Sequence, residues 1–169
     1  MTNQPIALSS LFSPEQILSG AQGGRVEETT RRMIDLIADS DSSIDSEAVY
    51  QLVLARKRCG ILLLQPGVVG VHVRISGLQR LRLALATSRE GQVCCPDRDD
   101  YICAETESVP ANLMVLMLAP ADAPALYLRA VATLSAICRR EGFVEFLLTL
   151  DSPELVWKTI AETGAALPD

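Results

Sequence analysis

One apolar run limits the folds that this chain can adopt. Residues Asn112 to Leu118 are almost continuously apolar, and the dipeptide Ala119-Pro120 follows. A short run of this kind, bounded by turn residues, is typical of a strand that other elements cover on both faces. Its six consecutive apolar residues, Leu113 to Leu118, fall far below the roughly 18 to 20 of a membrane-spanning helix. The sequence therefore predicts a sheet with a buried central strand.

Further strands and several helices are expected around this run. Strands are predicted at Ile61–Leu64, Val68–Ile75 and Leu81–Thr87, because these segments are short, rich in aliphatic residues and separated by Pro and Gly. Apolar spacing of three and four residues, together with capping signals, predicts helices. The expected helices cover residues 13–20, about 27–38, 46–60, 126–138, 142–148 and a last segment from 152 onward.

The predicted order is three helices, four strands and three helices. This order gives an α/β (α+β) fold with a central mixed β-sheet of four to five strands flanked by helices. The polar segment Gln92 to Val109 is expected to form either a hairpin excursion around Tyr101-Ile102-Cys103 or a mobile loop. No repeat or linker divides the 169 residues, so one domain over residues 1–169 is expected.

Composition excludes several classes of function. A net charge of -6 argues against sequence-independent nucleic-acid binding, which needs a basic surface. No signal peptide and no membrane span is apparent, so a soluble, cytoplasmic protein is expected. The five cysteines, including Cys94, Cys95 and Cys103, are irregularly spaced and form neither a disulfide framework nor a zinc motif. Neither a metal nor a cofactor is expected.

His72 is the only histidine in the chain. Histidine is the one side chain whose ordinary pKa lies near neutrality, so its neutral nitrogen can act as a nucleophile at cellular pH. A single histidine in a chain of this length is more often a packed or surface side chain. Arg56 and Arg74 belong to local basic clusters that are either a solvated face or an anion site.

The ordered motifs of the chain resemble a known family, the EIIA domains of the bacterial phosphotransferase system, of the fructose/mannitol and nitrogen-regulatory type. The resemblance covers roughly residues 8–164. It begins with Leu11-Phe12-Ser13-Pro14-Glu15-Gln16-Ile17, similar to the family's Leu-Leu-x-Pro-Glu-x-Ile, and continues with Arg56-Lys57 at an Arg-Glu motif. The stretch from Gly60 to Arg74 aligns without gaps with the family's Gly-Ser-Thr-Gly-Ile-Gly-Asn-Gly-Val-Ala-Ile-Pro-His-Ala-Arg. Pro120-Ala121-Asp122 and Ser152-Pro153-Glu154-Leu155 match later segments.

The resemblance implies a function for His72, because this residue falls on the family's phosphorylated histidine. His72 would then accept a phosphoryl group from an HPr-type phosphocarrier protein, with Arg56 and Arg74 as charge-stabilising residues. Gly67 would support the site, and Tyr127, at the position of a second family histidine, would orient the imidazole through its second nitrogen. The protein would be a phosphohistidine phosphotransferase, and the lack of an attached permease favours a regulatory role, such as nitrogen regulation, over sugar transport.

One segment departs from the family pattern. Residues Ile61 to Pro66 lack the two hydroxyls and two glycines of the family's loop, and glycines permit close approach of backbone to an anion. A second hypothesis is therefore a degenerate, non-catalytic protein-interaction or regulatory module that binds a regulatory target protein. The aliphatic segment could also support a homodimer. A third, a sensor using Cys94 and Cys95, would need a depressed thiol pKa.

Overall fold

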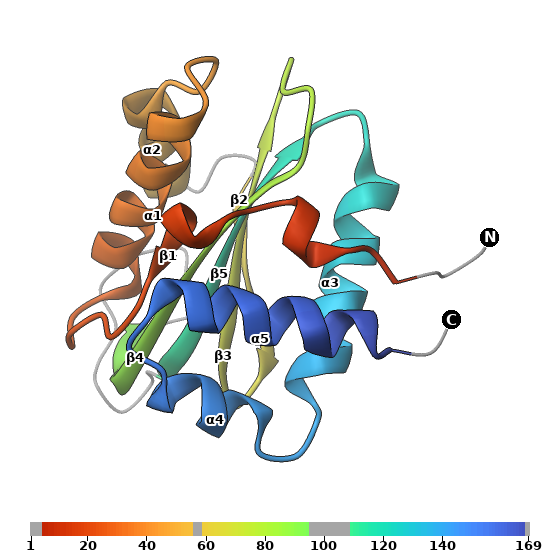
Figure 1. Ribbon diagram of the computed structural model, residues 1–169. Coiled ribbons are helices and arrows are strands. Elements are labelled where there is room, and N and C mark those ends of the chain that lie inside the picture. The colour runs from red at the N-terminus through yellow and green to blue at the C-terminus, as the bar shows by residue number, and fades with distance from the viewer. Residues whose placement is uncertain (1–4, 56–58, 95–108, 168–169) are drawn as a thin grey trace.

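A five-stranded mixed sheet runs through the middle of the protein (Figure 1). The computed structural model describes residues 5–55, 59–94 and 109–167. The strands are β1 (Ile17–Leu18), β2 (Cys59–Gln65), β3 (Gly67–Ile75), β4 (Arg82–Cys94) and β5 (Val109–Pro120). Their order across the sheet is β1-β4-β5-β3-β2. The pairs β1–β4 and β3–β5 are parallel, whereas β2–β3 and β4–β5 are antiparallel.

The predicted apolar run is the core of β5, the central strand. Its residues from Leu113 to Ala119 are all at most 1% exposed. Alternate side chains point to opposite faces of a strand, so Val115 and Met117 enter one core and Leu116 and Leu118 the other. The continuous hydrophobicity of the sequence therefore reports two hydrophobic cores that share a single strand.

Helices cover both faces of the sheet (Figure 1). On one face α1 (Val26–Ser40) and α2 (Ser46–Leu54) pack against Val69, Val71 and Val73 of β3. On the other face lie α3 (Pro124–Cys138), α4 (Phe143–Thr149) and α5 (Pro153–Ala165), with the short 3-10 helices η1 (Leu8–Ser10) and η2 (Pro14–Gln16). The predicted α/β class with a mixed sheet of four to five strands is confirmed.

Two predicted helices differ from the structure. The capping box of Ser13 and Gln16 is present, but it closes only the single turn η2. Ile17 is extended and pairs with Leu85 of β4, so β-pairing replaces the expected continuation to residue 20. The third helix ends at Leu54 rather than near Gly60, because Cys59 and Gly60 pair with β3. The polar segment after Gln92 joins the antiparallel strands β4 and β5, and residues 95–108 lie outside the described part.

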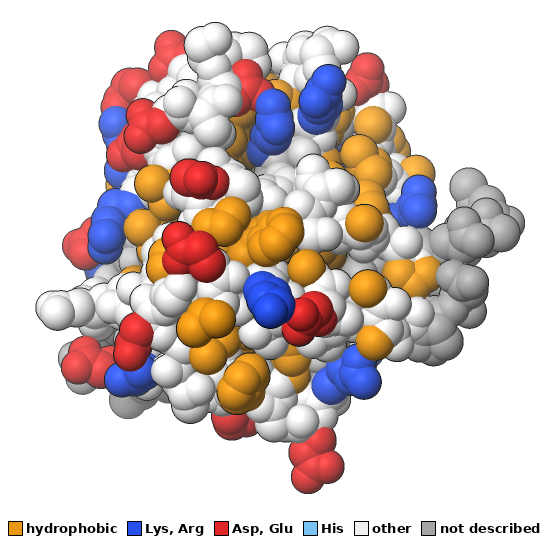
Figure 2. Space-filling model, viewed as in Figure 1, with side chains coloured by type: hydrophobic (Ala, Val, Ile, Leu, Met, Phe, Trp, Pro, Cys, Tyr) orange, Lys and Arg blue, Asp and Glu red, His pale blue; other side chains and the backbone are white. Residues whose placement is uncertain are grey.

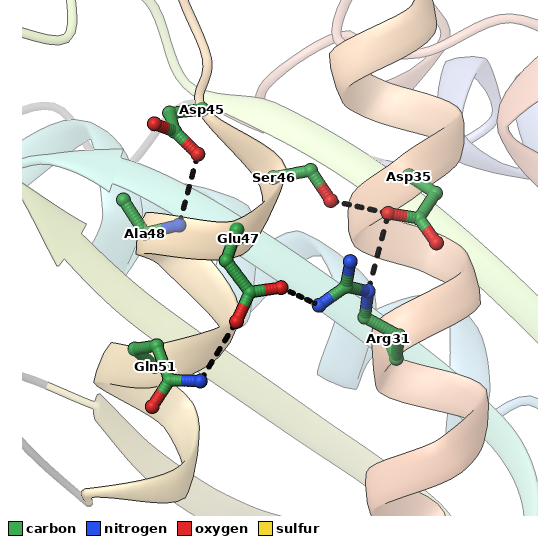
Figure 3. Close-up of polar contacts among 7 residues, drawn as sticks. All are labelled: Arg31, Asp35, Asp45, Ser46, Glu47, Ala48 and Gln51. Atoms are coloured by element: carbon green, nitrogen blue, oxygen red, sulfur yellow. Dashed lines mark hydrogen bonds and ion pairs between the residues drawn. The ribbon is translucent and has the colours of Figure 1, made fainter.

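Polar contacts fix α2 on α1 (Figure 3). Arg31 Nη1 donates to Glu47 Oε2 at 2.6 Å, and the Arg31 guanidinium lies 4.9 Å from the centre of the Tyr50 ring. The Ser46 hydroxyl donates to Asp35, and Asp45 caps α2 by accepting from the Ala48 N–H at 3.0 Å. These contacts surround the apolar seam between the helices and hold α2 over β3.

The pair formed by α1 and α2 is strongly acidic. Seven acidic and two basic residues lie between Val26 and Leu54. Figure 2 shows the acidic side chains, in red, crowded over this pair, while hydrophobic side chains gather on the face that α5 crosses. The local potential of the α1–α2 side therefore disfavours simple anions.

An ion pair connects the end of α1 to the sheet. Arg82 of β4 donates to Asp41 Oδ2 from Nη2 at 2.6 Å and from Nε at 3.0 Å. The Ser43 hydroxyl also donates to Asp41, at 2.6 Å. Hydrogen bonds from Ser43 and Arg82 lower the pKa of the Asp41 carboxyl.

The central strand sets the stability of the whole sheet. Replacing Leu116→Ala, a residue that is 0% exposed, should lower the free energy of unfolding by about 2–5 kcal/mol through the cavity it leaves. The matched control Leu128→Ala, at a leucine 61% exposed on α3, should change it by no more than about 0.5 kcal/mol. Urea denaturation followed by circular dichroism measures both, and equal losses would contradict the burial argument.

The Asp41 carboxylate should make stability depend on pH. A folded-state pKa below the unfolded value stabilises the protein above the unfolded pKa of about 3.9, and this stabilisation is lost as pH falls through the folded pKa. The wild type should therefore exceed Asp41→Asn in unfolding free energy at pH 7, and the difference should shrink below about pH 4. The exposed Asp39→Asn variant is the control, and a difference that is constant with pH would contradict the prediction.

Candidate functional site

His72 lies on β3, near the end where β3 and β5 run parallel toward their carboxyl ends. The residue is half-buried, and its Nδ1 atom is shielded from solvent. Val71 and Val73, on either side in sequence, face the α1–α2 core, so His72 faces the α3 side of the sheet. Backbone hydrogen bonds to β5 on one side of β3 and to β2 on the other hold the backbone of His72 in place.

The strand register determines what lies beside the imidazole. His72 is opposite Gly60 on β2 and opposite Met117 on β5. Leu62 is opposite Gly70, one pair further along the same face. Gly60 has no side chain, so β2 places none directly across from His72.

The first turn of α3 contacts the imidazole. Tyr127 is the fourth residue of α3, and its ring centre lies 4.9 Å from that of His72 with the planes inclined by 36°. Aromatic rings at this separation pack favourably in offset or tilted arrangements. Burial raises the pKa of the Tyr127 hydroxyl. The structure thus brings together the two residues that the sequence pairs, through a ring contact.

The amino end of α3 offers backbone donors near the imidazole. Its N-cap, Ala123, makes no side-chain capping bond, and Pro124 occupies the first helical position. The Ala121 N–H donates to the Ile75 carbonyl at 3.1 Å and ties this end of the helix to β3. An uncapped helix amino end carries unsatisfied N–H groups and a partial positive charge, which favour a nearby anion.

The other predicted site residues lie at different distances from His72. Arg74 is exposed and lies two residues beyond His72 on the same strand face, roughly 7 Å away along β3. Arg56 lies outside the described residues. Gly67 begins β3 with a φ of 80°, at the β2–β3 turn. Five residues of extended strand separate it from His72 by roughly 16 Å, so it shapes the turn rather than the imidazole's surroundings.

The segment from Ile61 to Gln65 is an edge strand and not a loop. It pairs antiparallel with β3, which occupies one side of its backbone hydrogen-bonding groups. Its Leu63 is 47% exposed. One side of the backbone here is therefore committed to the sheet, and the segment that departs from the family pattern forms an aliphatic edge strand.

Other chemistry finds no support in the described residues. Among residues 5–55, 59–94 and 109–167, no group of three or more His, Cys, Asp or Glu side chains could hold a metal ion. No helix in this part is long and apolar enough to cross a membrane. Burial raises the pKa of the Cys138 thiol to about 12, which keeps it protonated and unreactive.

The fold is that of phosphotransferase IIA proteins. Nitrogen regulatory protein IIA-Ntr from Neisseria meningitidis is similar with a TM-score of 0.70 and 21% identity, over 90% of this chain and 98% of that one. The mannitol-specific cryptic phosphotransferase enzyme IIA CmtB from Escherichia coli is similar with a TM-score of 0.61 and 21% identity. That match covers 93% of this chain and 99% of the other.

The family follows from the sequence itself. The model for the phosphoenolpyruvate-dependent sugar phosphotransferase system, EIIA 2, matches residues 10–163. The chain therefore belongs to this family, and the resemblance predicted from its motifs is confirmed. A search of curated proteins found no match.

Sequence reasoning missed the cross-strand neighbours of His72. Gly60 and Met117 became neighbours through the register of β2, β3 and β5, which no local pattern encodes. Gly70 is a sequence signal of this packing, since a Cβ at this position would lie 3.2 Å from the Met117 methyl group. That glycine therefore marks the place where Met117 packs over β3, one residue pair from the imidazole.

The ring contact between Tyr127 and His72 predicts that removing the Tyr127 ring shifts the nuclear magnetic resonance signal of His72, whereas removing only its hydroxyl does not. As the only histidine, His72 should give one Cε1–H signal in a nuclear magnetic resonance spectrum. Tyr127→Phe keeps the ring and should leave this signal near its wild-type position, whereas Tyr127→Ala removes the ring current and should shift it. Equal shifts in the two variants would instead implicate the hydroxyl.

Proposed function

We propose that this chain is a regulatory phosphocarrier that accepts a phosphoryl group on His72 from an HPr-type donor protein. The proposal includes a cytoplasmic location and one domain over residues 1–169. The family supplies the reaction class, and the observation that carries the proposal is the contact between His72 and the first turn of α3. A neutral imidazole nitrogen would attack the donor's phosphohistidine, so one N–P bond breaks as another forms.

The surroundings of His72 support this chemistry electrostatically. Phosphoryl transfer spreads negative charge over the phosphoryl oxygens, and positioned donors and cations stabilise it. The uncapped end of α3 would provide N–H groups, and Arg74 would provide a guanidinium from the same strand face. Tyr127 would hold the imidazole plane by ring packing, and Gly60 places no side chain across the strand pair.

A second candidate function rests on the edge strand. The aliphatic β2, with Leu63 exposed, favours a non-catalytic EIIA-like module that binds a regulatory target protein. In this alternative His72 is a remnant of the transfer site and Arg74 a solvated side chain. The two candidates differ in one measurable property, the formation of a phosphohistidine.

Phosphorylation by a reconstituted donor system tests the proposal. With phosphoenolpyruvate, the general donor enzyme and an HPr-type protein, the wild type should acquire an acid-labile phosphoryl group, detected by intact-mass spectrometry. His72→Ala should acquire none. Failure of the wild type, or an equal adduct on His72→Ala, would refute the phosphocarrier function and leave the interaction module.

Arg74 offers a second, independent test. If its guanidinium stabilises the transferring phosphoryl group, Arg74→Met should slow phosphorylation at least about tenfold, as expected from the loss of one charge-assisted contact. Arg80→Met removes another exposed arginine, in the loop between β3 and β4, and should leave the rate unchanged. Equal phosphorylation rates in Arg74→Met and Arg80→Met would contradict a role for Arg74 in phosphoryl transfer.

A further inference from the structure

A cleft lies far from His72, at the other edge of the sheet. It has a volume of about 650 Å³, within the range of small-molecule sites. Its walls are the end of β1 with the loop 19–23, one side of α1, and the start of α5 at Asp151 and Pro153. Strands β4, β5 and β3 separate β1 from the edge strand next to His72.

The floor of the cleft is a fixed polar network. Gln92 of β4 is 2% exposed, accepts from the Thr29 hydroxyl at 2.8 Å, and donates to the Gln22 carbonyl. The Gly20 N–H donates to the Thr87 hydroxyl at 3.1 Å, and the Gly23 N–H to Glu90 at 3.3 Å. These bonds shape the loop 19–23 before any ligand arrives, which lowers the entropic cost of binding.

Three side chains of the wall have unused binding capacity. Arg32 and Glu28 of α1 both line the cleft, and neither takes part in an ion pair within the described part of the chain. Their i, i+4 spacing places their side chains on one face of α1, but they do not pair with each other. Ser19 also lines the cleft, and its hydroxyl oxygen is buried with no hydrogen-bond partner among the described residues.

The charges indicate which kind of molecule fits. Arg32 matches a carboxylate, because a guanidinium presents parallel N–H donors to two oxygens. A simple anion is disfavoured, since Glu28 shares the wall and α1 and α2 together are strongly acidic. A molecule with an ammonium group beside its carboxylate satisfies both side chains at once. Ile17, Ala21 and Pro153 add an apolar part to the lining.

We propose that this cleft binds a small zwitterion, a free α-amino acid, with its carboxylate on Arg32 and its ammonium group on Glu28. The side chain of the amino acid lies toward Pro153. The site is separate from the phosphocarrier chemistry proposed for His72. It gives the protein a second binding site, located at the opposite edge of the sheet.

Titration followed through backbone amides tests the proposal. Glycine signals are well separated in ¹H–¹⁵N spectra, and Gly20 and Gly23 lie in the cleft while Gly77 and Gly142 lie elsewhere. A panel of free L-amino acids, with glycine as the minimal zwitterion, should produce saturable shifts at Gly20 and Gly23 only. The absence of saturable shifts with every amino acid at millimolar concentration would overturn the proposal.

Variants and analogues assign the two charges. Arg32→Met and Glu28→Gln should each weaken binding at least about tenfold, while their exposed positions on a helix keep the fold, as an unchanged amide spectrum would verify. Arg139→Met, at an exposed arginine after α3, is the matched control and should bind like the wild type. Propionate and propylamine each lack one of the two charges and should not bind measurably. Binding of either analogue as tight as that of the amino acids, or unchanged affinity in both cleft variants, would overturn the assignment.

Discussion

The double burial of β5 is the constraint on which the rest of the structure depends. The strand pairs with β4 on one side and β3 on the other, and its two faces belong to different hydrophobic cores. Helices are thereby required on both sides, because an exposed face of Leu116 and Leu118 or of Val115 and Met117 would cost several kcal/mol, at ~2 kcal/mol per side chain. The α1–α2 pair covers one face of the strand, and the α3–α5 group covers the other.

The same strand organises the surroundings of His72. β3 is parallel to β5, so the carboxyl ends of both strands meet near the amino end of α3. His72 is held at this place by ladder bonds from both neighbouring strands, and Tyr127 reaches it from the helix. A side chain on a strand that is paired on both sides has little freedom to move its backbone, so the position of His72 is fixed in the folded protein.

Much of the fold was predictable because periodicity reports burial. The apolar runs of β3 and β5 and the helical spacing of α1 and α3 follow directly from which faces are covered. The error at Ile17 has a tertiary cause: the capping box was correctly recognised, but pairing with Leu85 overrode the helix. The site was predictable in part. Family motifs pair His72 with Tyr127, whereas Gly60 and Met117 depend on register, and the cleft at Arg32 depends on four segments that no local signal connects.

The position of β5 in the sheet also governs how the chain can acquire its structure. β1 and β4 form one pair and β2 and β3 another, and among the strands of the described residues β5 alone joins them. It is also the last strand in the sequence, so on the ribosome the two half-sheets must wait for it with β3 and β4 unpaired along their inner edges. Open edges beside aliphatic faces are the surfaces through which chains associate wrongly. In the folded protein β5 covers the inner edges of β3 and β4. In the nascent chain these edges therefore stay exposed until residue 120 has emerged and β5 can pair with both strands.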